Sequence, residues 1–127
     1  MLVTSCAGDG QKTRATHLSE MRSSGTKIFV SRSTGYTNSA NRVKMTLNGK
    51  QLKSIGNKES IGALANTGSN SLTIAMGGAG SIGTKDTVRN FNMKAGEKKY
   101  FVINQDTNLF GATLKVYEVS EKEFLNS

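Results

Sequence analysis

The segment that most constrains the fold is a short hairpin pattern in the first half of the chain. Residues 42–47 alternate between polar and apolar side chains, and the apolar positions are Val43, Met45 and Leu47. This period of two is typical of a strand with one buried face. Asn48-Gly49 follows, and both residues tolerate the positive φ of a type I′ turn. We therefore predict an antiparallel hairpin in which residues 50–55 form the returning strand.

Similar signals recur along the chain at short spacing. Alternating or apolar runs predict further strands at residues 27–32, 60–65, 71–76, 87–93, 98–104 and 112–119. Ser120 and Glu123 have the spacing of a capping box, which predicts a terminal helical turn through Leu125. We predict an all-β fold: an antiparallel β-sandwich of about seven to eight short strands, with a flexible N-terminal tether and a short C-terminal helical turn.

The composition agrees with this fold class. The 127 residues include 14 Ser, 13 Thr, 11 Asn and 14 Gly, together 52, and these types favour turns, loops and strand faces over helix interiors. Proline and tryptophan are absent. No segment approaches the roughly 18 consecutive apolar residues of a membrane-spanning helix. These features exclude a helical membrane protein and a coiled coil.

Cys6 is the only cysteine, so the chain cannot form an intramolecular disulfide or a cysteine-based metal site. The residues before it, Val3-Thr4-Ser5, are an aliphatic side chain and two small ones, as in the lipobox of bacterial lipoproteins. We therefore expect residues 1–6 to be the remnant of a lipoprotein signal and Cys6 to carry a diacyl lipid. This expectation requires a precursor that extends upstream of Met1. The alternative is an unpaired thiol in the N-terminal segment.

The basic charge is concentrated in the first part of the chain. Residues 7–25 are predicted to be a flexible tether, followed by a domain at residues 26–127. The formal net charge is +8, and residues 11–50 hold eight Lys or Arg and one acid. We predict a basic contact patch made of Arg32, Arg42, Lys44, Lys50 and Lys53. Nucleic-acid binding would need exposed aromatics for base stacking, and we expect only Tyr36 to be exposed. We therefore favour an anionic membrane surface or an envelope protein as the partner, and do not expect nucleic acid.

Few residues could carry out chemistry. Residues 77–83 are rich in glycine, but a strand-like segment follows them instead of the helix that a phosphate-binding loop requires. His17 is the only histidine and lies in the predicted tether, away from the partners that general base catalysis needs. We identify no catalytic residue, no metal site, no cofactor and no small-molecule substrate, and we do not expect an enzyme.

Three segments occur in the same order along the chain as in the members of a known family. Val30-Ser31-Arg32 ends the first predicted strand, residues 45–50 carry an Asn-Gly-Lys hairpin, and residues 94–102 read KAGEKKYFV. Across residues 26–119 the chain resembles a family of small bacterial β-sandwich lipoproteins of unknown function. The resemblance implies a lipid-anchored β-sandwich, and it supplies no catalytic residue.

The leading hypothesis from the sequence is a non-enzymatic, lipid-anchored protein of the bacterial cell envelope, in which the β-sandwich acts as a binding or scaffold module. By resemblance to sorted lipoproteins, Ala7 after the cysteine indicates the outer membrane, with the domain facing the periplasm. Two alternatives stay open. One is an accessory lipoprotein of a multiprotein envelope machine such as a secretion system, and the other is a basic nucleic-acid-binding β-domain.

Overall fold

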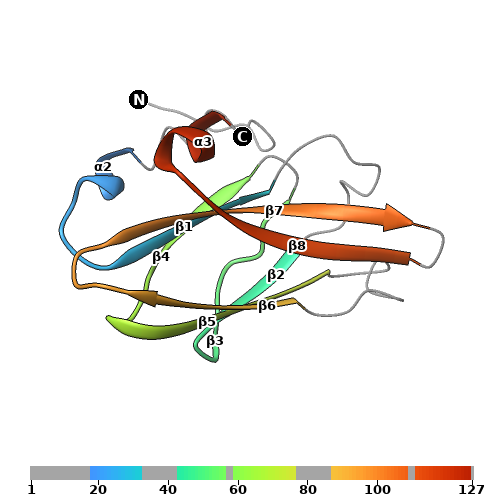
Figure 1. Ribbon diagram of the computed structural model, residues 1–127, viewed down its shortest axis with the longest axis horizontal. Coiled ribbons are helices and arrows are strands. Elements are labelled where there is room, and N and C mark those ends of the chain that lie inside the picture. The colour runs from blue at the N-terminus through green and yellow to red at the C-terminus, as the bar shows by residue number, and fades with distance from the viewer. Residues whose placement is uncertain (1–17, 33–42, 57–58, 77–86, 109–110, 127) are drawn as a thin grey trace.

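The computed structural model describes residues 18–32, 43–56, 59–76, 87–108 and 111–126 (Figure 1). It confirms the predicted all-β sandwich, because eight strands form two four-stranded sheets that pack face to face. Two short helices, α2 (Leu18–Met21) and α3 (Glu121–Asn126), lie on one side of this sandwich.

Sheet A has the strand order β4-β1-β7-β8. Its members are β1 (Lys27–Arg32), β4 (Ser60–Leu64), β7 (Lys98–Asn108) and β8 (Gly111–Val119). β1 pairs with β7 in parallel, and the other pairs are antiparallel. The parallel pair departs from the expected all-antiparallel arrangement, because the chain between these two strands crosses to the other sheet and returns.

Sheet B is antiparallel throughout and has the order β3-β2-β5-β6. Its members are β2 (Val43–Leu47), β3 (Lys50–Gln51), β5 (Gly68–Met76) and β6 (Thr87–Met93). β5 begins three residues before the predicted strand. The ladder with β6 therefore extends further along this strand than its local alternation indicated, whereas the ladder with β2 involves only residues 72–76.

The predicted hairpin is confirmed at its turn and in its first strand. Asn48 has φ of 53° and Gly49 has φ of 83°, as a type I′ turn requires. The returning strand is shorter than predicted. Leu47 lies opposite Lys50, but Val43 lies opposite Ile55, so the returning side contains one extra residue. This is the arrangement of a β-bulge, and it interrupts the ladder after β3.

The main hydrophobic core lies between the two sheets and contains the inward side chains of both. Val43, Met45 and Leu47 all belong to it, as the alternation predicted. Figure 1 shows the two helices above sheet A, on the side away from sheet B. Sheet A is therefore covered on both faces, which explains the continuous apolar runs in β1 and β7.

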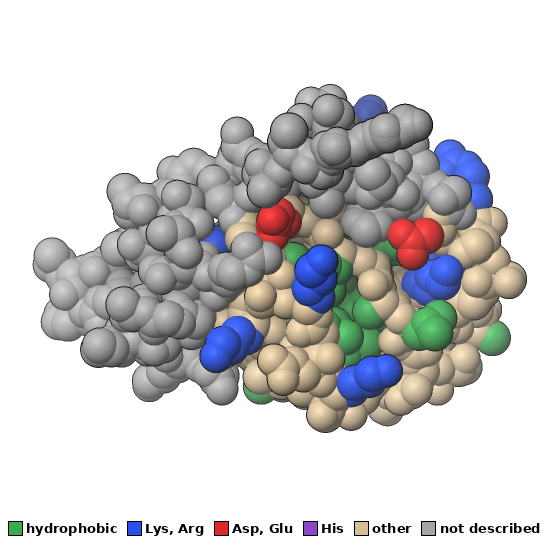
Figure 2. Space-filling model, turned by 180° about the vertical axis from the view of Figure 1, so that it is seen from behind, with side chains coloured by type: hydrophobic (Ala, Val, Ile, Leu, Met, Phe, Trp, Pro, Cys, Tyr) green, Lys and Arg blue, Asp and Glu red, His purple; other side chains and the backbone are tan. Residues whose placement is uncertain are grey.

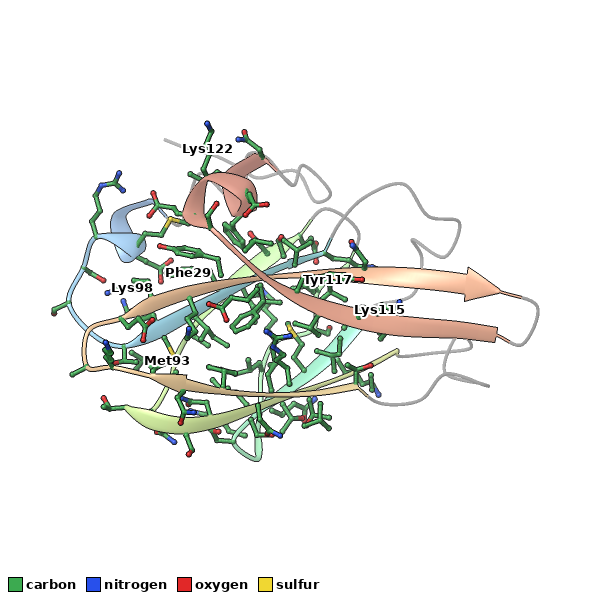
Figure 3. The ribbon with its side chains drawn as sticks, viewed as in Figure 1. Phe29, Met93, Lys98, Lys115, Tyr117 and Lys122 are labelled. Atoms are coloured by element: carbon green, nitrogen blue, oxygen red, sulfur yellow. The ribbon has the colours of Figure 1, made fainter. Side chains whose placement is uncertain are left out.

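A second, smaller cluster lies between the helices and the outer face of sheet A. It consists of Met21, Phe29, Tyr100 and Phe124, and Figure 3 shows Phe29 directed toward the helices. Met21 comes from the last part of the predicted tether, so residues 18–21 are ordered on the domain. Residues 22–25 connect α2 to β1, and residues 7–17 of the tether lie outside the described residues.

The capping box predicted for the terminal helix is confirmed. The backbone N–H of Glu123 donates to Oγ of Ser120 over 3.1 Å, and the backbone N–H of Ser120 donates to Oε1 of Glu123 over 3.1 Å. Each bond satisfies a backbone donor that a helix start would otherwise leave without a partner. Phe124 then points onto sheet A and is fully buried.

Candidate binding face

The outer face of sheet B is polar and nearly free of charge. The register of the four strands places ten described residues on it: Lys44, Thr46, Gln51, Ser69, Ser71, Thr73, Ala75, Val88, Asn90 and Asn92. We call this set the sheet B face, and Lys44 is its only charged member. None of the described helices covers it, since both lie on sheet A (Figure 1). The face is therefore a hydrogen-bonding surface open to solvent.

A shallow hollow of about 360 Å³ lies at one end of this face, where the β2–β3 turn meets β5 and β6. It is lined by Asn48, Ser69, Asn70, Ser71, Asn90, Phe91 and Asn92. The volume is at the lower end of the range of small-molecule sites, roughly 300–1,000 Å³. Carboxamides and hydroxyls dominate the lining, and no charged side chain contributes to it.

Asn70 forms the rigid base of the hollow. Its side chain is buried, and Oδ1 accepts hydrogen bonds from Nδ2 of Asn48 and from the backbone N–H of Asn66, both over 2.9 Å. Its Nδ2 donates to the carbonyl oxygens of Asn66 over 2.8 Å and Gly68 over 3.1 Å. Four bonds offset the cost of burying this carboxamide and hold the loop before β5 in place.

Asn48 forms one rim of the hollow through the turn geometry described above. Its Oδ1 accepts from the backbone N–H of Ser71 over 2.8 Å, and its backbone N–H donates to the Ser71 carbonyl over 2.9 Å. The side chain is therefore fixed by β5 as well as by Asn70. A residue selected by the type I′ turn thus also positions a carboxamide at the candidate site.

Other polar groups of the hollow have unused hydrogen-bonding capacity. Within the described residues, the Asn90 carboxamide and the Ser71 hydroxyl make no hydrogen bond. Ser69 donates only a long bond of 3.5 Å to Oδ1 of Asn92. The hollow therefore combines a fixed base and rim with groups that can still bind a ligand.

An ionic network joins the edges of the two sheets on another side of the sandwich. Nζ of Lys99 lies 3.0 Å from Glu118 and 3.5 Å from Glu97, and Arg89 of β6 lies 4.0 Å from Glu118. The hydrogen bond to Glu118 raises the pKa of the Lys99 ammonium group. The bond that Glu97 accepts from the backbone N–H of Lys94 lowers the pKa of that carboxyl group. These groups neutralise one another, so we assign them a structural role.

The described members of the predicted basic patch, Arg32, Lys44, Lys50 and Lys53, do not share one exposed face. Arg32 was wrongly placed on the surface: its side chain is 3% exposed, and burial lowers the pKa of its guanidinium group. Lys44, Lys50 and Lys53 are exposed, but Lys50 pairs with inward-facing Leu47 and so projects from the opposite side of the hairpin to Lys44. Figure 2 shows Lys and Arg side chains spread around a hydrophobic area on the side seen from behind.

The remaining predicted site residues lie outside the described residues. They are Val3, Thr4, Ser5, Cys6, His17, Tyr36, Arg42 and residues 77–83. In the part of the chain that is described, no three His, Cys, Asp or Glu side chains gather where they could hold a metal ion. No helix among these same residues is long and apolar enough to cross a membrane.

The structure defines the chain as a two-sheet β-sandwich with a polar face that carries one charged residue and that no described helix covers. A scan against protein-family models found no match, and a search of curated proteins found none. The sheet B face was not predicted from the sequence, although the sequence contains a signal for it. The outward positions of residues 69–75 and 88–92 are Ser, Thr, Ala, Val and Asn, without one charge.

Proposed function

We propose that this chain is a non-enzymatic, lipid-anchored binding module of the bacterial cell envelope, attached through Cys6, with the sheet B face as its binding surface. The observation that carries the proposal is the single charged residue among the ten on that face, in a chain of net charge +8. The cores of protein binding surfaces are depleted of charged residues, because each charge must lose its hydration when the surface is covered.

The position of α2 agrees with attachment through the N-terminal segment. Met21 packs on the outer face of sheet A, so the described chain enters the domain on the side opposite the sheet B face. Eleven residues, 7–17, separate Cys6 from α2, and a fully extended chain of this length spans at most about 40 Å. A lipid on Cys6 would keep the domain close to a membrane and leave the sheet B face available to a partner.

The anchor is tested by expressing the complete gene product in bacteria and comparing it with Cys6→Ser. We expect the native protein to fractionate with membranes and mass spectrometry to find a diacyl group on Cys6. The Cys6→Ser variant should be released from membranes with the folded domain unchanged by circular dichroism. An unmodified Cys6 in membrane fractions would overturn this part of the proposal.

The binding surface is tested by photo-cross-linking in living cells from two matched positions. Val88 on the sheet B face is 56% exposed, and Tyr117 on the outer face of sheet A is 44% exposed. A photoreactive residue at position 88 should cross-link to a discrete envelope component, whereas one at position 117 should not. Equal cross-linking from both positions, or none from position 88, would contradict the assignment. A stoichiometric protein captured at position 88 would favour the accessory role in an envelope machine.

A further inference from the structure

We infer that the hollow on the sheet B face binds an uncharged saccharide, one or two units of a glycan chain at a time. This inference rests on the proposed function, since it names the ligand class of the same face. Sugar hydroxyls both donate and accept hydrogen bonds, and so do the carboxamides and hydroxyls that line the hollow. A ligand without charge suits this lining, because no charged side chain is present to bind an ion.

The hollow is organised in advance for such a ligand. Asn48 and Asn70 are held by the hydrogen bonds described above, so binding need not immobilise them. The Asn90 carboxamide and the Ser71 hydroxyl lie on neighbouring strands, directly opposite each other in the β5–β6 register. These two groups can bond to adjacent hydroxyls of one sugar ring without first breaking a bond within the described protein. A fixed frame with available polar groups reduces the entropic cost of binding.

Other ligand classes fit the hollow less well. A phosphate or carboxylate would need a basic group, and a hard metal ion would need carboxylates, yet the lining contains neither. Base stacking needs an exposed aromatic ring, and Phe91 is only 8% exposed and packs against Phe101 with ring centroids 5.0 Å apart. The buried ring also deprives a sugar of a stacking platform. We therefore expect weak binding, with a dissociation constant on the order of 1 mM.

The test is a titration of the full chain with a neutral tetramer of β-1,4-linked N-acetylglucosamine. Binding is monitored through the amide chemical shifts in nuclear magnetic resonance spectra. Saturable shifts are expected at Ser69, Ser71 and Asn90, with a dissociation constant that does not change when the salt concentration is raised. Asn90→Ala should weaken binding about five- to tenfold, as expected for the loss of one hydrogen bond. Asn126→Ala removes an exposed carboxamide from α3, outside the hollow, and should have no effect.

The saccharide inference can fail in this experiment while the proposed function still stands. Asn90 is exposed and has no described side-chain partner, so its variant should fold, and its amide spectrum will verify this. Failure of both this tetramer and maltotetraose to shift the hollow residues would overturn saccharide binding. An equal loss of saccharide affinity in the Asn90→Ala and Asn126→Ala variants would overturn the assigned site. Amide shifts of the hollow residues that are induced by an uncharged extended peptide, and not by the sugars, would also overturn it. Cross-linking from position 88 would still support the proposed function in each of these cases.

Discussion

Gly62 provides a direct test of how tightly the outer cluster of sheet A is packed. It lies in β4 opposite Phe29, which in turn lies opposite Tyr100 of β7. A Cβ atom added to Gly62 would stand 2.9 Å from Cε1 and 3.1 Å from Cδ1 of Phe29. Carbon atoms in ordinary contact are about 3.5–4.0 Å apart. The Gly62→Ala variant therefore requires the Phe29 ring to move by about half an ångström or more.

The ring has little room for this movement. Phe29 is fully buried, stacks on Tyr100 with centroids 5.6 Å apart at an angle of 16°, and meets Phe124 at 6.3 Å. Overpacking of a well-packed cluster costs about 1–3 kcal/mol. Replacing Gly by Ala also restricts the unfolded chain, which stabilises a protein by about 0.4–1 kcal/mol where the backbone permits. We expect a net loss of about 1–2 kcal/mol in the free energy of unfolding.

Urea unfolding of four proteins measures the effect: the native chain, Gly62→Ala, Phe29→Val and the double variant. Phe29→Val removes both ring atoms that the new Cβ would meet, so only the restriction of the unfolded chain should remain. In that background Gly62→Ala should stabilise the protein by up to about 1 kcal/mol, a reversal of sign. An equal effect of Gly62→Ala in the two backgrounds would refute the clash as its cause.

Three other substitutions should change the free energy of unfolding through the hydrogen bonds or the burial of one side chain. Ser120→Ala removes the acceptor for the Glu123 N–H and should lower the free energy of unfolding by about 1 kcal/mol in urea unfolding, while Ser120→Asp should retain most of it. Asn70→Asp places a carboxylate against two carbonyl oxygens and should cost more than about 2 kcal/mol by the same measurement. Burial, with the hydrogen bond to Glu121, raises the pKa of Tyr100 from 10.0 to about 12. The folded state therefore holds the proton more tightly than the unfolded state, so stability should be complete below pH 10 and should fall by on the order of 2 kcal/mol as the pH rises to 12. Tyr100→Phe should flatten this part of the pH profile.

Features determined by local chemistry were predictable from the sequence. The Asn48-Gly49 turn follows from two residues that tolerate positive φ, and the cap of α3 follows from two side chains three residues apart. The parallel pairing of β1 with β7 has no such local cause, because neither strand encodes its neighbour. Residues 16–21 could form a helical turn on docking, and α2 is such a turn: it has four residues, is too short to be stable alone, and is ordered by the contact of Met21 with sheet A.

The candidate site was less predictable, because the prediction relied on charged residues and one of them, Arg32, is buried. The alternation in β1 could have excluded Arg32, since it shares a parity with Ile28 and Val30 and those two side chains face the core. The sheet B face, in contrast, cannot be recognised from one strand alone. Most of its outward side chains are Ser, Thr and Asn, which are common on exposed strands, and they form a surface only when four strands are placed side by side.

Asn70 shows how a departure from the sandwich pattern shapes the candidate site. It occupies an inward position of β5, in line with Leu72 and Ile74, where an apolar side chain would fill the core without any need for hydrogen bonds. A buried carboxamide is tolerated there only because all of its donors and acceptors can be matched, and the groups that match it belong to the β2–β3 turn and to the loop before β5. An apolar residue would leave the Asn48 carboxamide with Ser71 as its remaining partner and would remove one of the two contacts that hold the rim of the hollow. Departures of this kind from the local pattern are expected at functional sites, where shape takes precedence over stability. This buried polar position of β5 therefore connects the fold to the candidate binding site.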